Sequence, residues 1–221
     1  REHLRTQADR HPGPDCEAPE LASEHDVREL TGDGGVPPRA PWPPAAGVPL
    51  VDGVVAAWRE SVFAPRRFFP QLGRSDGLLA SALYYLGLGI IVAGVTLFWR
   101  MVLPLPEPGG VLAAVLRMGD GGGSPLLDFL LSPLALLASL LIAAGVVHLL
   151  LLIVGGAKEG IGTTVRVFCF AYGPQLFAVV PLIGAVIGGI WSVVLAIVGL
   201  RAAHATDGWR AAIAVLLPLC V

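Results

Sequence analysis

Residues 134–154 read LALLASLLIAAGVVHLLLLIV, and this stretch decides the class of fold. It contains no Asp, Glu, Lys or Arg, and its only polar side chains are Ser139 and His148. The hydrocarbon core of a bilayer is about 30 Å thick, and about 20 helical residues cross it. The stretch therefore predicts a helix that spans a membrane.

The composition of the whole chain supports the same conclusion. Of its 221 residues, 54% are hydrophobic and 14% are charged, and the mean hydropathy is +0.70, far from the values of soluble proteins. A net charge of −2 without a basic tract argues against a nucleic-acid partner. Cys16, Cys169 and Cys220 form no CxxC pair, so neither a zinc site nor a disulfide framework is predicted. The single lysine among fifteen basic residues favours a bacterial origin, and we expect no cofactor.

The apolar runs predict an all-α polytopic membrane bundle with five spans. The third expected span is short and is interrupted by Tyr-Gly-Pro at 172–174, and the last would cover only half a bilayer, so we expect it to be truncated. The expected transmembrane domain is 73–221, with spans at about 78–102, 134–154, 164–180, 182–200 and 211–221.

Two segments precede this domain. Residues 1–48 are rich in Pro, Gly and charged side chains, which predicts a disordered tail. Residues 49–72 carry apolar side chains at helical spacing up to Pro65, which predicts an amphipathic helix at the membrane surface. Packing of this helix on protein is the alternative. The residues expected at the membrane surface are Trp58, Arg66, Arg67, Phe68 and Phe69.

The basic residues that flank the spans predict the orientation. Eight of them fall on one side, and only Arg100 and Arg117 fall on the other. The bias places the N-terminus in the cytoplasm, and we expect a multi-pass protein of the plasma (inner) membrane. The eight residues are Arg59, Arg66, Arg67, Arg74, Lys158, Arg166, Arg201 and Arg210.

The glycine-rich stretch at 155–163 lies between the second and third spans. A phosphate-binding P-loop needs G-x-x-x-x-G-K-[ST] after a strand, whereas here Lys158 precedes Gly160 and a membrane helix comes before both. We instead expect Gly155 and Gly156 to end one helix, and Thr163 or Thr164 to N-cap the next.

His148 is a titratable group inside an apolar run, and such groups usually face protein or water. We favour a hydrogen bond to Tyr172, to Gln175 or to a backbone carbonyl, with a proton relay or a metal ligand as alternatives.

Other polar residues lie near the cytoplasmic ends of the spans. Arg166 could pair with Glu159 and His204 with Asp207, while Arg201 reaches lipid phosphates. A metal site of His148, His204 and Glu159 would need three segments to converge.

Small residues recur every fourth position in the fourth span, at Gly184, Gly188, Ser192 and Ala196. Such a ridge allows another helix to approach closely. We expect it to pack within the bundle, and homodimerisation through this span is the alternative.

Several stretches resemble the Yip domain family, the Ypt-interacting integral membrane proteins, and specifically its prokaryotic branch. They are AWRESVFAPRRFF, HLLLLIVGGAKEGIGTTVRV, AYGPQLFAVVPLIG with IWSVVLAIVGLRAAH, and WRAAIAVLLP, in this order within residues 55–221. The resemblance implies a five-span bundle with a cytoplasmic tail. The residues at positions typical of the branch are His148, Arg166, Tyr172, Pro174, Trp191, Arg201 and His204.

The eukaryotic members of this family are trafficking factors that bind Rab-type GTPases. Their acidic-Leu-Tyr-Gly-Pro motif is absent here, so that activity is not expected. The sequence contains neither a G-x-S-x-G nor an HExxH motif, so neither of these motifs indicates an enzyme. We expect a non-enzymatic protein that acts on the bilayer or on a membrane-protein partner in membrane organisation or trafficking-like roles. The alternative is a small transporter or channel that uses polar groups of spans 2 and 3, because interrupted helices often line binding sites.

Overall fold

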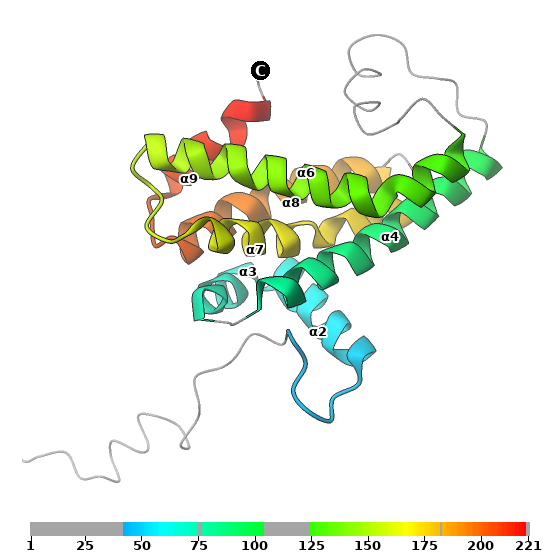
Figure 1. The fold of residues 1–221 in the computed structure, drawn as a ribbon, viewed down its shortest axis with the longest axis horizontal. Helices are drawn as coiled ribbons and strands as arrows, with labels where there is room; N and C mark the ends of the chain where they lie inside the picture. The colour runs from blue at the N-terminus through cyan, green and yellow to red at the C-terminus, as the bar shows by residue number, and fades with distance from the viewer. Residues whose placement is uncertain (1–41, 75–76, 104–123, 182, 220–221) are drawn as a thin grey trace, which may run out of the picture. The chain divides into compact units, whose positions relative to one another are not determined.

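The structure is a computed structural model that describes residues 42–74, 77–103, 124–181 and 183–219. Its described elements are all helical, which confirms the predicted all-α class (Figure 1). They are α2 (Leu50–Phe63), α3 (Pro65–Phe68), the 3-10 helix η1 (Phe69–Arg74), α4 (Leu78–Val102), α6 (Pro125–Ile153), α7 (Ile161–Ala171), the 3-10 helix η2 (Gly173–Val179), α8 (Ile183–Ala203), α9 (Gly208–Leu216) and the 3-10 helix η3 (Leu217–Leu219).

Three of the described helices, α4, α6 and α8, are long and apolar enough to cross a membrane. Large apolar side chains remain exposed along them, as Leu134 and Ile142 do on α6 and Ile190 on α8. Exposed side chains of this kind are expected where a helix faces lipid instead of water. The chain is therefore a multi-pass membrane-embedded helical bundle.

Helix α6 begins earlier than the apolar run suggested, at Pro125 instead of residue 134. The side chain of Ser124 accepts a hydrogen bond from the backbone N–H of Leu127, and Pro125 occupies the first turn, where its missing N–H costs nothing. At its other end, Gly155 has φ of 67°. Gly155 and Gly156 donate to the carbonyls of Leu152 and Leu151, a Schellman motif that confirms the predicted helix end.

The third expected span is broken at the predicted place. Helix α7 ends at Ala171, and η2 continues through Pro174, whose missing N–H interrupts the α-helical pattern. At about 1.5 Å per α-helical and about 2 Å per 3-10 residue, the two pieces together extend about 30 Å, the thickness of the hydrocarbon core. Helix α7 begins at Ile161 with Gly160 as its N-cap, so the expected capping by Thr163 or Thr164 is wrong.

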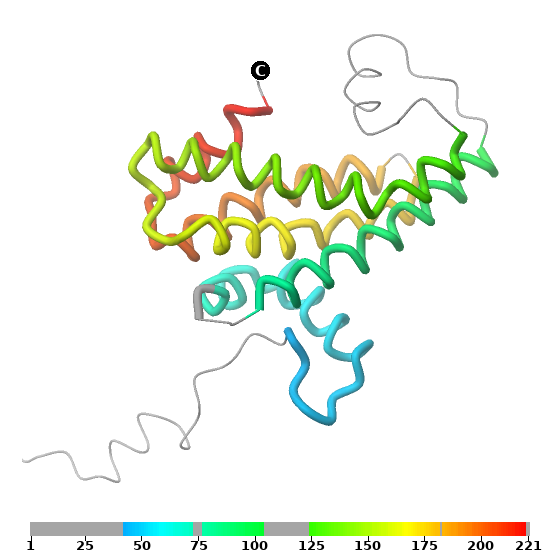
Figure 2. The backbone as a smooth tube through the Cα atoms, in the orientation of Figure 1, coloured from blue at the N-terminus to red at the C-terminus, as the bar shows by residue number. Residues whose placement is uncertain are grey.

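The last helical segment, Gly208–Leu219, is apolar but shorter than a full span. The expected count of five crossings stays a prediction. Figure 2 shows that the α6–α7 and α8–α9 connections lie at the same end of the bundle, where Lys158 donates to the carbonyl of Ala205 at 2.7 Å. We call this end, formed by α3 and the two connections, the basic end.

The core contains a cluster of aromatic side chains from four segments. Phe68 and Phe69 are fully buried, and Phe68 stacks edge-to-face on Phe170 with ring centroids 4.8 Å apart. Their expected position at the membrane surface is therefore wrong, because the turn into α3 directs both rings between the helices. Trp42, which is also buried, donates to the carbonyl of Ala80 at 2.7 Å, so the packed part of the chain begins before the expected boundary at 48. The expectation of a disordered tail otherwise lies outside the described residues.

Candidate functional site

A hydrogen-bond network joins α6, α7 and the end of α8 at the basic end. His148 Nδ1 lies 2.9 Å from Thr164 Oγ1, which in turn lies 3.0 Å from Nε2 of His204. The backbone N–H of Glu159 donates to the other ring nitrogen of His204, Nδ1, at 3.2 Å. Both Thr164 and His204 are fully buried. A single threonine hydroxyl thus bridges His148 on α6 and His204, which directly follows α8.

The contact with Glu159 fixes the direction of this network. Because His204 Nδ1 accepts a hydrogen bond, the neutral ring carries its proton on Nε2 and donates to Thr164 Oγ1. The hydroxyl is then free to donate to His148 Nδ1. Burial, and next the neighbouring His148, lower the pKa of His204 below its ordinary value of 6.5, while Glu159 opposes the shift. His204 is therefore held as a neutral donor at physiological pH.

The expected partners of these residues need correction. His148 contacts neither Tyr172 nor Gln175, but Thr164. His204 contacts Thr164 and Glu159, not Asp207, whose carboxylate lies 3.5 Å from Arg210.

Arg166 likewise differs from its expected pairing with Glu159. It donates instead to the carbonyl of Leu72 at 2.9 Å, which ties α7 to η1. The three segments carrying His148, His204 and Glu159 do converge, but no group of three potential metal ligands forms among the described residues.

Two tryptophan side chains connect α2 to the broken third span and to α8. Trp58 Nε1 donates to the carbonyl of Gly173 at 2.9 Å, and Trp191 Nε1 donates to the carbonyl of Val62 at 3.1 Å. Pro174 is buried, and its carbonyl oxygen faces Gly188 of α8. Trp58 is thus partly buried against η2, and Trp191 connects α8 to α2.

Tyr172 and Gln175, on the same broken segment, line a groove of about 700 Å³ between α4 and α6. Thr96, Ser132 and Ser139 also line it, and their hydroxyl groups donate to backbone carbonyls of their own helices. The Arg100–Asp128 ion pair, at 3.2 Å, lies at the end of the groove away from the basic end. The groove therefore combines an interrupted helix with several hydrogen-bonding side chains.

The small-residue ridge of α8 faces η2 of the same chain. A Cβ on Gly184 would clash with the backbone carbonyl of Phe177, and one on Gly188 would lie 2.6 Å from the carbonyl oxygen of Pro174. Ser192 accepts a hydrogen bond from Gln175 at 3.5 Å, and Ala196 is buried. The ridge thus packs within the bundle. Homodimerisation through this span stays a prediction.

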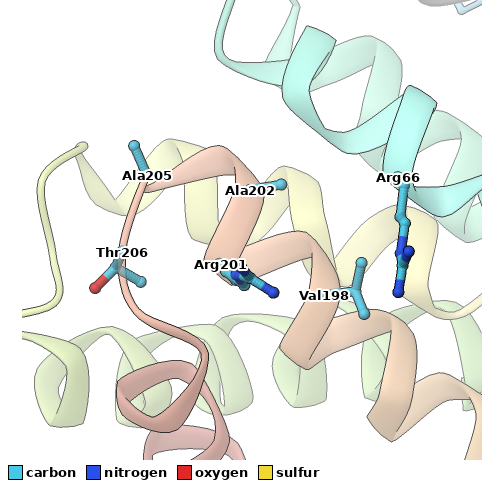
Figure 3. A pocket seen from close by; sticks show the side chains of 6 residues that line it. All are labelled: Arg66, Val198, Arg201, Ala202, Ala205 and Thr206. Atoms are coloured by element: carbon cyan, nitrogen blue, oxygen red, sulfur yellow. The ribbon is translucent and has the colours of Figure 1, made fainter.

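Two arginines that the sequence placed near lipid phosphates come together at the basic end. Arg66 on α3 and Arg201 on the last turn of α8 line one pocket and are both exposed (Figure 3). Arg67, the neighbour of Arg66, is exposed but does not line this pocket. Sequence reasoning missed this convergence, and it missed Thr164 as the bridge between the histidines, because both arise from contacts between distant segments.

Apolar spanning helices around a broken helix define an integral membrane protein built as a helical bundle. The family model for the Yip1 domain matches residues 59–221, and the chain belongs to this family. Neither a curated protein nor a solved structure matches it.

Proposed function

We propose that this Yip1-domain protein is non-enzymatic and organises membranes through contacts with lipids and membrane-protein partners at its basic end. One observation carries the proposal. Helix α2 is attached to the bundle on one side and exposes apolar side chains on the other, and exposed arginines lie on α2 and on the adjoining α3. This combination is typical of helices that lie in the membrane interface.

The packing of α2 explains why it has one buried side and one exposed side. Gly53, Ala57 and Ser61 are buried, so small side chains bring the helix close to its neighbours. Leu50 and Val51, 66% and 69% exposed, are left on the outside, together with Val55 and Phe63. Arg59, Arg66 and Arg67 are also exposed. The apolar side chains would enter the acyl boundary while the arginines reach the phosphates.

The distribution of charge supports a basic end on the cytoplasmic side of the membrane. Lys158 donates to Ala205 and Arg210 donates to the carbonyl of Gly155, so the two connections share this end. Arg100 lies at the other end of the bundle and is neutralised by Asp128. Excess basic residues on one side favour the cytoplasmic side.

The position of α2 can be tested with a spin label in the full chain in vesicles. Val55→Cys, in a Cys16→Ser and Cys220→Ser background, should place the label where oxygen relaxes it strongly and a water-soluble nickel chelate weakly. Glu60→Cys, on the exposed polar side of the same helix, is the control and should show the reverse. Strong relaxation by the chelate at residue 55 would contradict an interfacial helix.

A small transporter is the second candidate, because Tyr172 and Gln175 of the broken helix line the groove between α4 and α6. Flux across proteoliposomes separates the two functions. The leading proposal predicts no saturable uptake of protons, ions or small polar solutes above that of empty vesicles. Saturable uptake that Gln175→Leu abolishes would instead establish transport.

A further inference from the structure

A pocket of about 590 Å³ opens at the basic end between α3 and the end of α8. Figure 3 shows its lining residues, which are Arg66, Val198, Arg201, Ala202, Ala205 and Thr206. In this view Arg66 and Arg201 extend toward Val198 from opposite sides. Two guanidinium groups from distant segments thus share one open pocket whose other lining side chains are small or apolar.

Among the residues that the structure describes, no carboxylate neutralises the two guanidinium groups of this pocket. None of the described residues that line it is acidic, and within the described ranges neither Arg66 nor Arg201 forms an ion pair. Two other arginines differ, since Arg100 pairs with Asp128 and Arg210 with Asp207. Like charges held near one another are unfavourable, and an anion between them would remove that cost.

The chemistry of the pocket selects a phosphate. Guanidinium groups bind phosphate oxygens through paired N–H donors, and two of them can hold one phosphate from two sides. Ala205, which forms part of the wall, has its carbonyl occupied by Lys158 at 2.7 Å. This contact places the ammonium group of Lys158 near the pocket as a third cation. It also occupies a carbonyl oxygen that would otherwise repel an anion.

The depth of the pocket in the membrane indicates where the phosphate comes from. Arg201 lies in the last turn of α8, one of the helices long enough to span a bilayer. The end of a spanning helix lies at the level of the lipid headgroups. Val198 and Ala202, one turn apart on the same helix, provide an apolar wall beside the arginines, which suits a phosphate attached to a glycerol and acyl chains.

We propose that this Arg66–Arg201 pocket binds the headgroup phosphate of an anionic glycerophospholipid. The proposal deepens the proposed function, on which it rests, by giving lipid contact a defined site. Its failure is distinguishable from that of the proposed function, because the spin-label experiment on α2 does not involve the pocket.

The test is lipid binding to the purified full chain in detergent, measured by native mass spectrometry with phosphatidylglycerol and with phosphatidylcholine. Arg66→Gln and Arg201→Gln should each weaken phosphatidylglycerol binding about tenfold, equivalent to about 1.4 kcal/mol. The matched control is Arg67→Gln, one residue along α3 and outside the pocket, which should change the affinity less than about twofold. Unchanged thermal unfolding of all three variants will show that they fold.

Two results would overturn the proposal. If Arg67→Gln weakens binding as much as Arg66→Gln, the lipid responds to the general surface charge and not to the pocket. If inorganic phosphate binds the pocket and phosphatidylglycerol does not compete with it, the ligand is a soluble anion and not a lipid. Competition between the two, together with loss of both in the Arg66→Gln/Arg201→Gln double variant, is the result expected for a headgroup site.

Discussion

Gly188→Ala is expected to destabilise the bundle by about 3 kcal/mol, the upper part of the range for overpacking a tight contact. The added Cβ would lie 2.6 Å from the carbonyl oxygen of Pro174 and 3.4 Å from the Cα of Gln175. Both are backbone atoms of η2, so no side-chain rotation can relieve the clash. The broken helix must move away from α8, which also separates Gln175 from Ser192.

Gly189→Ala is the matched control for this experiment. No atom outside the local helix lies within 4 Å of the position of its Cβ, so only the helix propensity changes, and it favours alanine by about 1 kcal/mol. Thermal unfolding in the same detergent should therefore move in opposite directions for the two neighbouring variants. At about 2–4 °C per kcal/mol, Gly188→Ala should lower the midpoint by about 6–12 °C. Equal midpoints would contradict the close packing of α8 on η2.

The sequence predicted the ridge of small residues but not its partner. A four-residue repeat shows that one face of α8 can be approached closely, whichever element approaches it. The partner is η2, which follows from the Tyr-Gly-Pro break and the turn at Pro181 that brings the two segments together. The break itself was predictable, because Pro174 lacks the N–H that an α-helix needs.

Helix ends can be predicted from neighbouring residues, whereas the burial of a side chain depends on contacts between distant segments. Span 1 was predicted at 78–102, the bounds of α4, because Gly77 and Pro104 delimit the apolar run in the sequence. The start of α6 was missed, although Ser124 followed by Pro125 is a local signal of a helix N-terminus. The position of Phe68 and Phe69 could not be predicted locally, because two aromatic residues beside two arginines suit either a core or a membrane surface.

His148 and His204 were both identified from the sequence, but their common partner was not. Thr164 is one of two adjacent threonines in the first turns of α7, and the helix rotation alone decides which of them points at the histidines. That rotation depends on how α7 packs between α6 and α8. The neighbouring sequence therefore does not predict which threonine contacts the histidines.

Thr164→Val is expected to cost about 2–4 kcal/mol, because valine keeps the shape of threonine and removes the hydroxyl that serves both rings. The Nε2–H of His204, a fully buried residue, would lose its acceptor, and His148 Nδ1 would lose its donor. A buried polar group without a partner costs about 1–3 kcal/mol, and two are affected. The midpoint of thermal unfolding at pH 7.5 should fall by about 4–16 °C.

Thr163→Val provides the control for the loss of a buried threonine hydroxyl in α7. Thr163 is 7% exposed and contacts neither histidine, so its substitution should shift the midpoint by less than about 2 °C. Both variants replace a buried threonine of α7 with valine at neighbouring positions. Only Thr164 belongs to the hydrogen-bond network with the two histidines. A shift of the same size in both would mean that the hydroxyl of Thr164 does not hold α6, α7 and α8 together at the basic end, and that packing alone does.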